Sequence, residues 1–211
     1  MYPQPPWKLE GHAVQTLQLL DIDRVSALIP AELEIVSILP GKTLGGVYVA
    51  SYSAGSVLVY NELIVVSAVV RHGGKIGAWI SHIYVDDPNS VAGGREIWGL
   101  PKELAQFTWD SEKKTSVQVK QGDELLCTLN GHWQLPGWQQ ALTGSVFSVV
   151  DSNLAVFEGQ AKFKLALANT DLQVPSESPF GWLGLGQAWL SFQLNPLHLA
   201  VHAPQFVQAK N

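Results

Sequence analysis

The stretch GGREIWGLPKE, residues 93–103, decides how we place the rest of the chain. Two glycines after an Asp-Asp-Pro-Asn run predict a turn, and the four residues that follow predict a short helix. Gly99 and Pro101 end that helix, because glycine tolerates unusual backbone angles and proline lacks an N–H donor. Lys102 therefore follows a rigid corner among apolar residues, where it can be aimed into a dry pocket. The alternative is a surface lysine after a turn, which is the commoner situation for lysine.

On both sides of this corner the sequence predicts a β-rich fold. An extended arm from Pro3 to Trp7 and a short helix between Asp21 and Ile29 come first. Branched and aromatic segments bounded by turn residues predict strands at 13–20, 47–52, 57–60, 63–70, 76–85, 106–110, 115–120, 124–129, 147–150, 154–157, 162–168, 187–194 and 197–201. Many antiparallel strands with few short helices indicate a closed or double-layer β architecture around an interior. No long linker divides residues 1–211, so we expect one domain.

Composition narrows the classes of function. The chain is 46% hydrophobic and 15% charged, as in a globular protein, and its 13 basic residues are scattered under a net charge of −5. Nucleic-acid binding is therefore not expected. No apolar run approaches the ~20 residues of a membrane helix, no secretory signal is visible, and the single Cys127 cannot form an internal disulfide. We expect a cytoplasmic protein whose eight tryptophans fill a β core, subunit contacts or an aromatic cavity.

No metal or cofactor site is predicted. His198 and His202 would share a face only on a helix, and residues 197–201 are predicted as a strand. The glycines of 181–186 lack the G-x-G-x-x-G order and the strand-to-helix setting of a dinucleotide-binding loop.

The residues around the corner resemble the active-site signature of the acetoacetate decarboxylase family. In that signature an Arg-Glu segment is followed by Pro-Lys, and here these are Arg95-Glu96 and Pro101-Lys102. Further similarity lies in Pro6-Trp7-Lys8, Ile29–Glu34 and Tyr60–Leu63. Within the superfamily, Pro5–Trp7, Thr43–Gly46, Ala50–Tyr52 and Glu62-Leu63 are similar to a branch that includes the plant neoxanthin-deficient proteins. The resemblance implies a double-layer β cone around an internal cavity, and a homo-oligomer.

The resemblance also implies a set of site residues. Lys102 would be the Schiff-base lysine, and Glu62 would orient the substrate or move protons. The alternatives for Glu62 are a salt bridge, for instance to Arg95, or exposure at a strand end. Supporting and substrate-binding roles are expected at His12, Arg95, Glu96, Trp98, Leu100 and Trp79. A Schiff-base lysine needs a neutral amine, and free lysine titrates near ~10.4, so its pKa must be lowered by about 3–4 units, or about 5 kcal/mol. Burial can supply this shift, and a cationic neighbour can contribute.

Three positions depart from the family pattern. A second lysine follows the Schiff-base lysine in the decarboxylase proper, whereas this chain has Glu103. That anion favours the protonated amine unless it points away. The family arginine that holds the substrate carboxylate falls on His12, and a further pocket glutamate falls on Val47. The ionic groups that surround and bind the acid substrate in the family are thus altered, whereas the Schiff-base lysine and one glutamate are kept.

Two functions follow from this pattern. The first is a cofactor-free lyase, in which Lys102 forms an iminium with a β-keto acid or related keto compound; an aldolase or dehydratase acting through the same imine is a close variant. The second is a non-covalent binding protein, or an isomerase-like one, for a large apolar ligand such as a carotenoid or isoprenoid. The tryptophan content and the altered ionic positions favour the second.

Overall fold

The computed structural model describes residues 1–110, 112 and 115–207, and it confirms a mainly β fold with few short helices. The helices are α1 (Ile22–Val25) and α2 (Pro88–Trp98), with 3₁₀ turns at Ser26–Leu28 and Gly181–Leu183. The strands are β1 (Trp7–Asp21), β2 (Glu34–Ile35), β3 (Lys42–Tyr52), β4 (Asn61–His72), β5 (Lys75–Val85), β6 (Lys102–Leu104), β7 (Gln106–Trp109), β8 (Val117–Gln121), β9 (Glu124–Gln134), β10 (Trp138–Val150), β11 (Asn153–Gln173), β12 (Leu190–Val201) and β13 (Gln205–Phe206). No helix in this part of the chain has the length and apolar character needed to cross a membrane.

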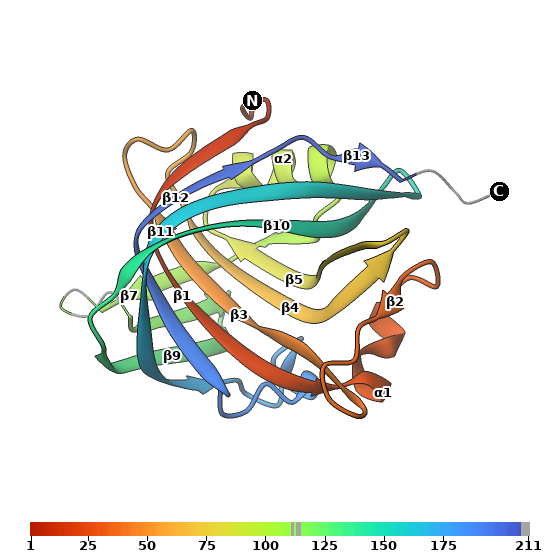
Figure 1. The fold of residues 1–211 in the computed structure, drawn as a ribbon. Helices are drawn as coiled ribbons and strands as arrows, with labels where there is room; N and C mark the ends of the chain where they lie inside the picture. Colours follow the sequence, from red (N-terminus) through yellow and green to blue (C-terminus); the bar gives the residue numbers. More distant parts are fainter. Residues whose placement is uncertain (111, 113–114, 208–211) are drawn as a thin grey trace.

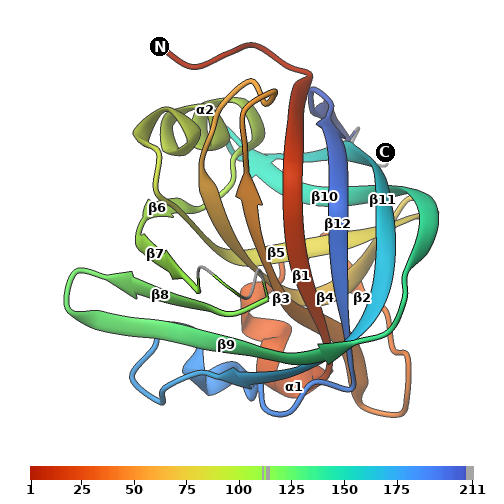
Figure 2. The same ribbon diagram turned by 90° about the vertical axis from the view of Figure 1, so that its left-hand side faces the viewer.

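The strands form one large sheet that closes on itself (Figure 1). Its order is β10-β5-β4-β3-β1-β12-β11, and β10 pairs again with β11, which completes a ring. Most pairs are antiparallel, but β5 pairs in parallel with both β6 and β10. Strands β9, β8 and β7 continue from β11 as a meander at one side of the ring (Figure 2), and the short strands β2, β6 and β13 pair with β4, β5 and β11.

Strands β3 and β4 separate two interiors. Alternate side chains along a strand point to opposite faces. Val47, Val49, Leu63 and Val65 therefore face a packed core that also contains residues of β8, β9 and the segment from Phe180 to Leu185. The residues between them on β4, such as Ile64, face the inside of the ring. Because both faces are covered, these strands are apolar almost throughout.

Two predicted breaks are absent. The segments 154–157 and 162–168 belong to one strand, β11, because Gly159 is paired on both sides, with Gly144 of β10 and Val201 of β12. The segments 187–194 and 197–201 likewise join in β12. Its Pro196 lies where the pairing with both neighbours shifts register, a position that tolerates the missing N–H of proline.

The predicted strand at 57–60 is wrong. Residues 57–60 form a loop, in which Val57 and Val59 are exposed and the N–H of Val57 bonds to the carbonyl of Lys8. Branched and aromatic residues suggested a strand there, but the segment makes only isolated backbone hydrogen bonds, such as that of Val57 to Lys8, and no ladder.

Helix α2 is longer than predicted and contains the two glycines. It begins at Pro88, where the Asp87 side chain accepts a hydrogen bond from the N–H of Ser90 at 2.7 Å. The glycines serve close packing instead of a turn. A Cβ at Gly93 would lie 2.6 Å from the ring of Trp7, and one at Gly94 would lie 2.4 Å from Lys102 Cδ.

Candidate active site

Lys102 is fixed by the end of α2 and by β5. The helix ends at Gly99, whose φ of 62° is the left-handed conformation that glycine adopts freely. Arg95 Nε then donates a hydrogen bond of 2.7 Å to the Lys102 carbonyl, and β6 pairs with β5 at Ile83. The backbone of Lys102 is therefore held by two regular elements, the end of α2 and strand β5.

Alternation along β6 sends Lys102 and Glu103 to opposite faces. Lys102 is buried, whereas Glu103 is exposed and accepts a hydrogen bond from Gln121 Nε2 at 2.8 Å. Glu103 therefore points away from the Lys102 amine, although Glu103 directly follows Lys102 in sequence.

The anion that faces the amine is Glu62. Lys102 Nζ lies 2.7 Å from Glu62 Oε1, with the two side chains only 4% and 6% exposed, and it donates a second hydrogen bond of 3.0 Å to Ser90 Oγ. The amine also lies 5.6 Å and 5.2 Å from the ring centres of Trp7 and Tyr60, within cation–π range. The salt bridge expected as an alternative for Glu62 exists, with Lys102 as its partner in place of Arg95.

Tyrosines surround the carboxylate of Glu62. Tyr52 donates to Oε2 at 3.1 Å and Tyr60 to Oε1 at 3.5 Å, and the hydroxyl of Tyr48 lies 3.1 Å from that of Tyr52. Burial raises the pKa of Tyr52 and of Tyr60 well above 10, and the charge of Glu62 raises both further. These hydroxyls therefore keep their protons and act as hydrogen-bond donors to the carboxylate.

This cluster lines a cavity of about 460 Å³ inside the ring. Its wall is formed by mostly apolar residues of the ring strands β1, β3, β4, β5, β10, β11 and β12, together with Tyr60, Trp98, Leu100 and Lys102. Lys102 and Glu62 are the charged residues in this wall. A ligand here would meet one ion pair, a few polar oxygens and otherwise hydrocarbon.

The predicted site residues divide into two groups. Trp98 and Leu100 line the cavity with Lys102 and Glu62. The other four lie outside it. His12 packs edge-on against Trp109, with ring centres 5.0 Å apart, and Glu96 accepts a hydrogen bond from Tyr2 at 2.5 Å. Arg95 holds the Lys102 backbone. Trp79 of β5 packs against the main hydrophobic core.

Several cavity residues were absent from the prediction. Val47, which the sequence count matched to the family's second pocket glutamate, faces the packed core, and the next residue, Tyr48, faces the cavity. Gln15 and Tyr52 of the cavity wall were also missed, as was Ser90, which accepts a hydrogen bond from Lys102. Residues 47–52 belong to the strand that pairs with the one carrying Glu62. Alternation with a period of two along this strand would have indicated Tyr48 and Tyr52 as cavity residues.

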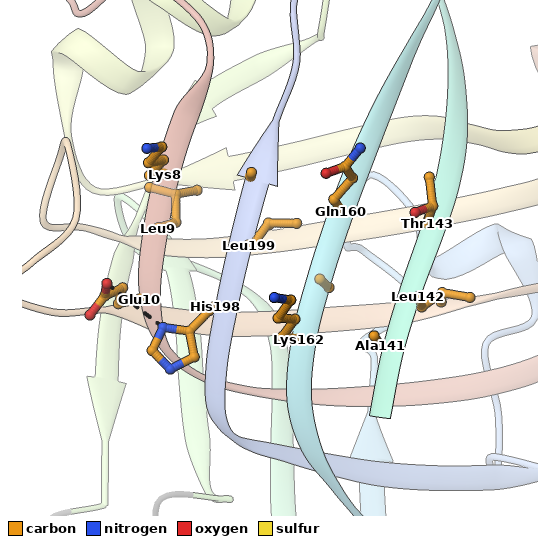
Figure 3. Close-up of a pocket in the computed structure, with 12 residues that line it drawn as sticks. Lys8, Leu9, Glu10, Ala141, Leu142, Thr143, Gln160, Lys162, His198 and Leu199 are labelled. Atoms are coloured by element: carbon orange, nitrogen blue, oxygen red, sulfur yellow. Dashed lines mark ion pairs between the residues drawn. The ribbon is translucent and has the colours of Figure 1, made fainter. Parts of the chain in front are cut away.

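A second hollow of about 400 Å³ lies on the outside of the same wall (Figure 3). It is bordered by exposed polar side chains, including Lys8, Lys162 and an ion pair between Glu10 and His198. Leu9 and Leu199 contribute to both hollows, because a single layer of strands separates them. Among the described residues, no three or more His, Cys, Asp or Glu side chains are grouped to hold a metal ion.

Comparison with solved structures shows the same fold in known enzymes. An acetoacetate decarboxylase from Legionella pneumophila superposes with a TM-score of 0.71, covering 98% of this chain and 89% of that chain at 17% identity. The enduracididine biosynthesis enzyme MppR in complex with pyruvate gives a TM-score of 0.72, covering 99% and 92% at 13% identity.

Sequence comparison adds relatives of two kinds. Protein NEOXANTHIN-DEFICIENT 1 of Solanum lycopersicum is 33% identical over 119 residues, which are 56% of this chain and 39% of that protein. Acetoacetate decarboxylase of Acidiphilium cryptum is 44% identical over 48 residues, 23% of this chain and 20% of that protein. The matches thus span well under half of each relative. The profile described as acetoacetate decarboxylase (ADC) matches residues 1–166, which is most of the chain. The resemblance drawn from the Arg95–Lys102 signature is thereby confirmed, and the chain belongs to the acetoacetate decarboxylase family.

Proposed function

We propose that Lys102 is a nucleophile that forms an imine with a keto compound bound in the cavity. The observation that carries this proposal is the Lys102–Glu62 contact of 2.7 Å, buried in the wall of an apolar cavity of about 460 Å³. A buried ammonium and carboxylate in contact can exchange a proton, which yields a neutral amine and a neutral acid and removes two buried charges at once.

The chemistry then follows with Glu62 as proton carrier. The amine of Lys102 attacks the ketone carbon, and Glu62 returns its proton to the departing hydroxyl, which leaves as water. The resulting iminium accepts the electron pair of the bond to a β-carboxylate, which leaves as carbon dioxide. A proton taken up from solvent adds to the enamine carbon, and water then hydrolyses the iminium formed in this way, which releases the ketone and restores Lys102 and Glu62. An aldolase or dehydratase would use the same iminium and differ in the bond that breaks.

Trapping tests this proposal directly. The protein is incubated at neutral pH with a panel of β-keto acids, pyruvate and acetylacetone, reduced with borohydride and mapped by mass spectrometry. We expect an adduct on Lys102, none in Lys102→Ala, and a rate about 10²–10⁴-fold lower in Glu62→Gln. Lys8→Ala is the matched control, because Lys8 lies exposed on the outer hollow. Equal labelling of Lys8, Lys42 and Lys102 would contradict the proposal.

A second candidate function is non-covalent binding of a large apolar ligand such as a carotenoid or isoprenoid. It is favoured by the hydrocarbon lining, by the pairing of Lys102 with Glu62, which leaves no unpaired charge in the cavity wall, and by the NEOXANTHIN-DEFICIENT 1 relatives. Extraction of the purified protein with organic solvent should then release a stoichiometric lipid or pigment. Borohydride would leave Lys102 unlabelled, which separates this function from the first.

A further inference from the structure

Besides the Lys102–Glu62 cluster, the cavity contains two polar side chains that face each other across neighbouring strands. Gln15 of β1 and Tyr48 of β3 are direct partners in the antiparallel pairing, and both line the cavity. Side chains of directly opposed residues lie close enough to bind one group together. Their hydrogen bonds determine what that group must be.

The amide nitrogen of Gln15 is already engaged. The pairing of β1 with β3 is interrupted between Gln15 and Gln18, which leaves backbone carbonyls without strand partners. Gln15 Nε2 donates to two of them, to Thr16 O at 2.7 Å and to Val47 O at 3.3 Å. Only the nitrogen can donate, so this network fixes the amide orientation and leaves Oε1 as the group available to a ligand.

The hydroxyl proton of Tyr48 is engaged as well. A phenol has one proton, and Tyr52 uses its proton in the bond to the Glu62 carboxylate. A charged carboxylate is the stronger acceptor, so the 3.1 Å contact between the two tyrosines must use the proton of Tyr48. Burial raises the pKa of Tyr48, which keeps this proton in place. The Tyr48 oxygen therefore offers only lone pairs.

The tryptophan N–H groups of the cavity wall are also committed. Trp7 Nε1 donates to Pro3 O at 2.9 Å and Trp98 Nε1 to His202 O at 2.8 Å. The donor left for a ligand is the third N–H of the Lys102 ammonium, beyond those given to Glu62 and Ser90. The cavity thus has a donor at Lys102 and paired acceptors at Gln15 and Tyr48.

We propose that Gln15 Oε1 and Tyr48 Oη form an acceptor pair that binds a hydroxyl group of the ligand. The ligand class is a neutral, largely apolar molecule with a hydroxyl set apart from the oxygen that meets Lys102. A carboxylate at this end is disfavoured, since it would face two oxygen lone pairs without a proton. The inference that the ligand has a carbonyl end rests on the proposed function, whereas the inference that it has a hydroxyl end does not.

The test uses a series of straight methyl ketones of five to ten carbons that carry a terminal hydroxyl. Each is compared by calorimetric titration with its methyl ether and with the ω-carboxylate of the same length. At the best length we expect the alcohol to bind about three- to tenfold more tightly than the ether, and the carboxylate to bind most weakly. Gln15→Met/Tyr48→Phe should abolish the preference for the alcohol, with each single variant intermediate and thermal melting as the check on folding.

The outcomes separate the two proposals. Suppose that the preference for the alcohol persists in Lys102→Ala and that the unaltered protein gives no borohydride adduct. This result would contradict the imine proposal and support the acceptor pair. An adduct on Lys102 with equal affinity for alcohol and ether would overturn the acceptor pair alone. The pair is also overturned if the preference survives in the double variant, or if neither alcohol nor ether binds at any length.

Discussion

Two ion pairs occupy the two hollows on opposite sides of one layer of strands. Inside, Lys102 and Glu62 are 2.7 Å apart and almost completely buried. Outside, His198 Nδ1 and Glu10 Oε1 are 3.7 Å apart, and both side chains are about half exposed (Figure 3). Water screens the outer pair and stabilises its members separately, whereas the inner pair depends on its own contact and on its hydrogen bonds. Burial therefore decides how strongly the two members of each pair depend on one another.

The largest effect should come from breaking the inner pair. Lys102→Met leaves the Glu62 carboxylate buried without its counter-charge, so the free energy of unfolding should fall by about 3–5 kcal/mol in urea denaturation at neutral pH. Lys102→Met/Glu62→Leu removes both charges and should recover most of that loss. Single and double variants of equal stability would mean that water reaches the pair.

Filling the space beside Lys102 should have the next largest effect. Gly94→Ala places a Cβ 2.4 Å from Lys102 Cδ and 2.7 Å from Cε, which must displace the side chain from Glu62. We expect a loss of about 1–3 kcal/mol in unfolding free energy, as for overpacking, and a slower borohydride trapping reaction. Gly144→Ala is the control, since a Cβ there meets nothing within 4 Å. Identical effects at both glycines would refute the packing argument.

The pH at which each tyrosine ionises should distinguish the buried tyrosines from Tyr2. Burial raises the pKa of Tyr52 and Tyr60 well above 10 and that of Tyr84 to about 12. The pKa of Tyr2, which is only partly buried, is raised by its hydrogen bond to Glu96. A raised folded-state pKa contributes stability that is complete below the unfolded value of 10 and is lost as pH rises through the folded value.

The melting temperature should therefore fall between pH 10 and 12, with phenolate absorbance appearing first from Tyr2. Tyr2→Phe should remove that first step and leave the later ones. Phenolate from the cavity tyrosines already at pH 10 in the folded protein would contradict the burial argument.

The smallest effect is expected at the outer pair. Glu10→Gln should change the unfolding free energy by less than about 1 kcal/mol, and added salt should erase even this difference, because exposed charges are screened. Chemical denaturation with and without salt measures it. A loss as large as that of Lys102→Met would show that exposure is a poor guide to the strength of these pairs.

The sequence predicted the β-rich class and both members of the inner pair. Lys102 and Glu62 could be found because Arg95–Lys102 and Tyr60–Leu63 resemble segments of the decarboxylase family. The helix end at Gly99 and Pro101 marks the corner but does not by itself separate Lys102 from a surface lysine. The cavity wall was harder to predict. Moving one position along a strand reverses the face, so the count that reached Val47 missed Tyr48, and His12 lies out of phase with Leu9 and Gln15, which line the cavity.

Tertiary contacts decided the remaining differences. The two glycines of α2 were predicted as a turn, because the packing of Trp7 against Gly93 joins segments distant in sequence and that of Lys102 against Gly94 depends on how the chain folds back after the helix. The hydrogen bonds that orient Gln15 depend on an interruption between β1 and β3, which no local pattern indicates.

The alternation along β3 and β4 has a consequence for evolution. Neighbouring positions there have different surroundings, because Val47 and Leu63 face the packed core whereas Tyr48 and Ile64 face the cavity inside the ring. A single substitution at an inward position can alter ligand preference while the packed layer stays intact. Under the proposed function, a point mutation at such a position would change the ligand that meets Lys102 without rebuilding the architecture.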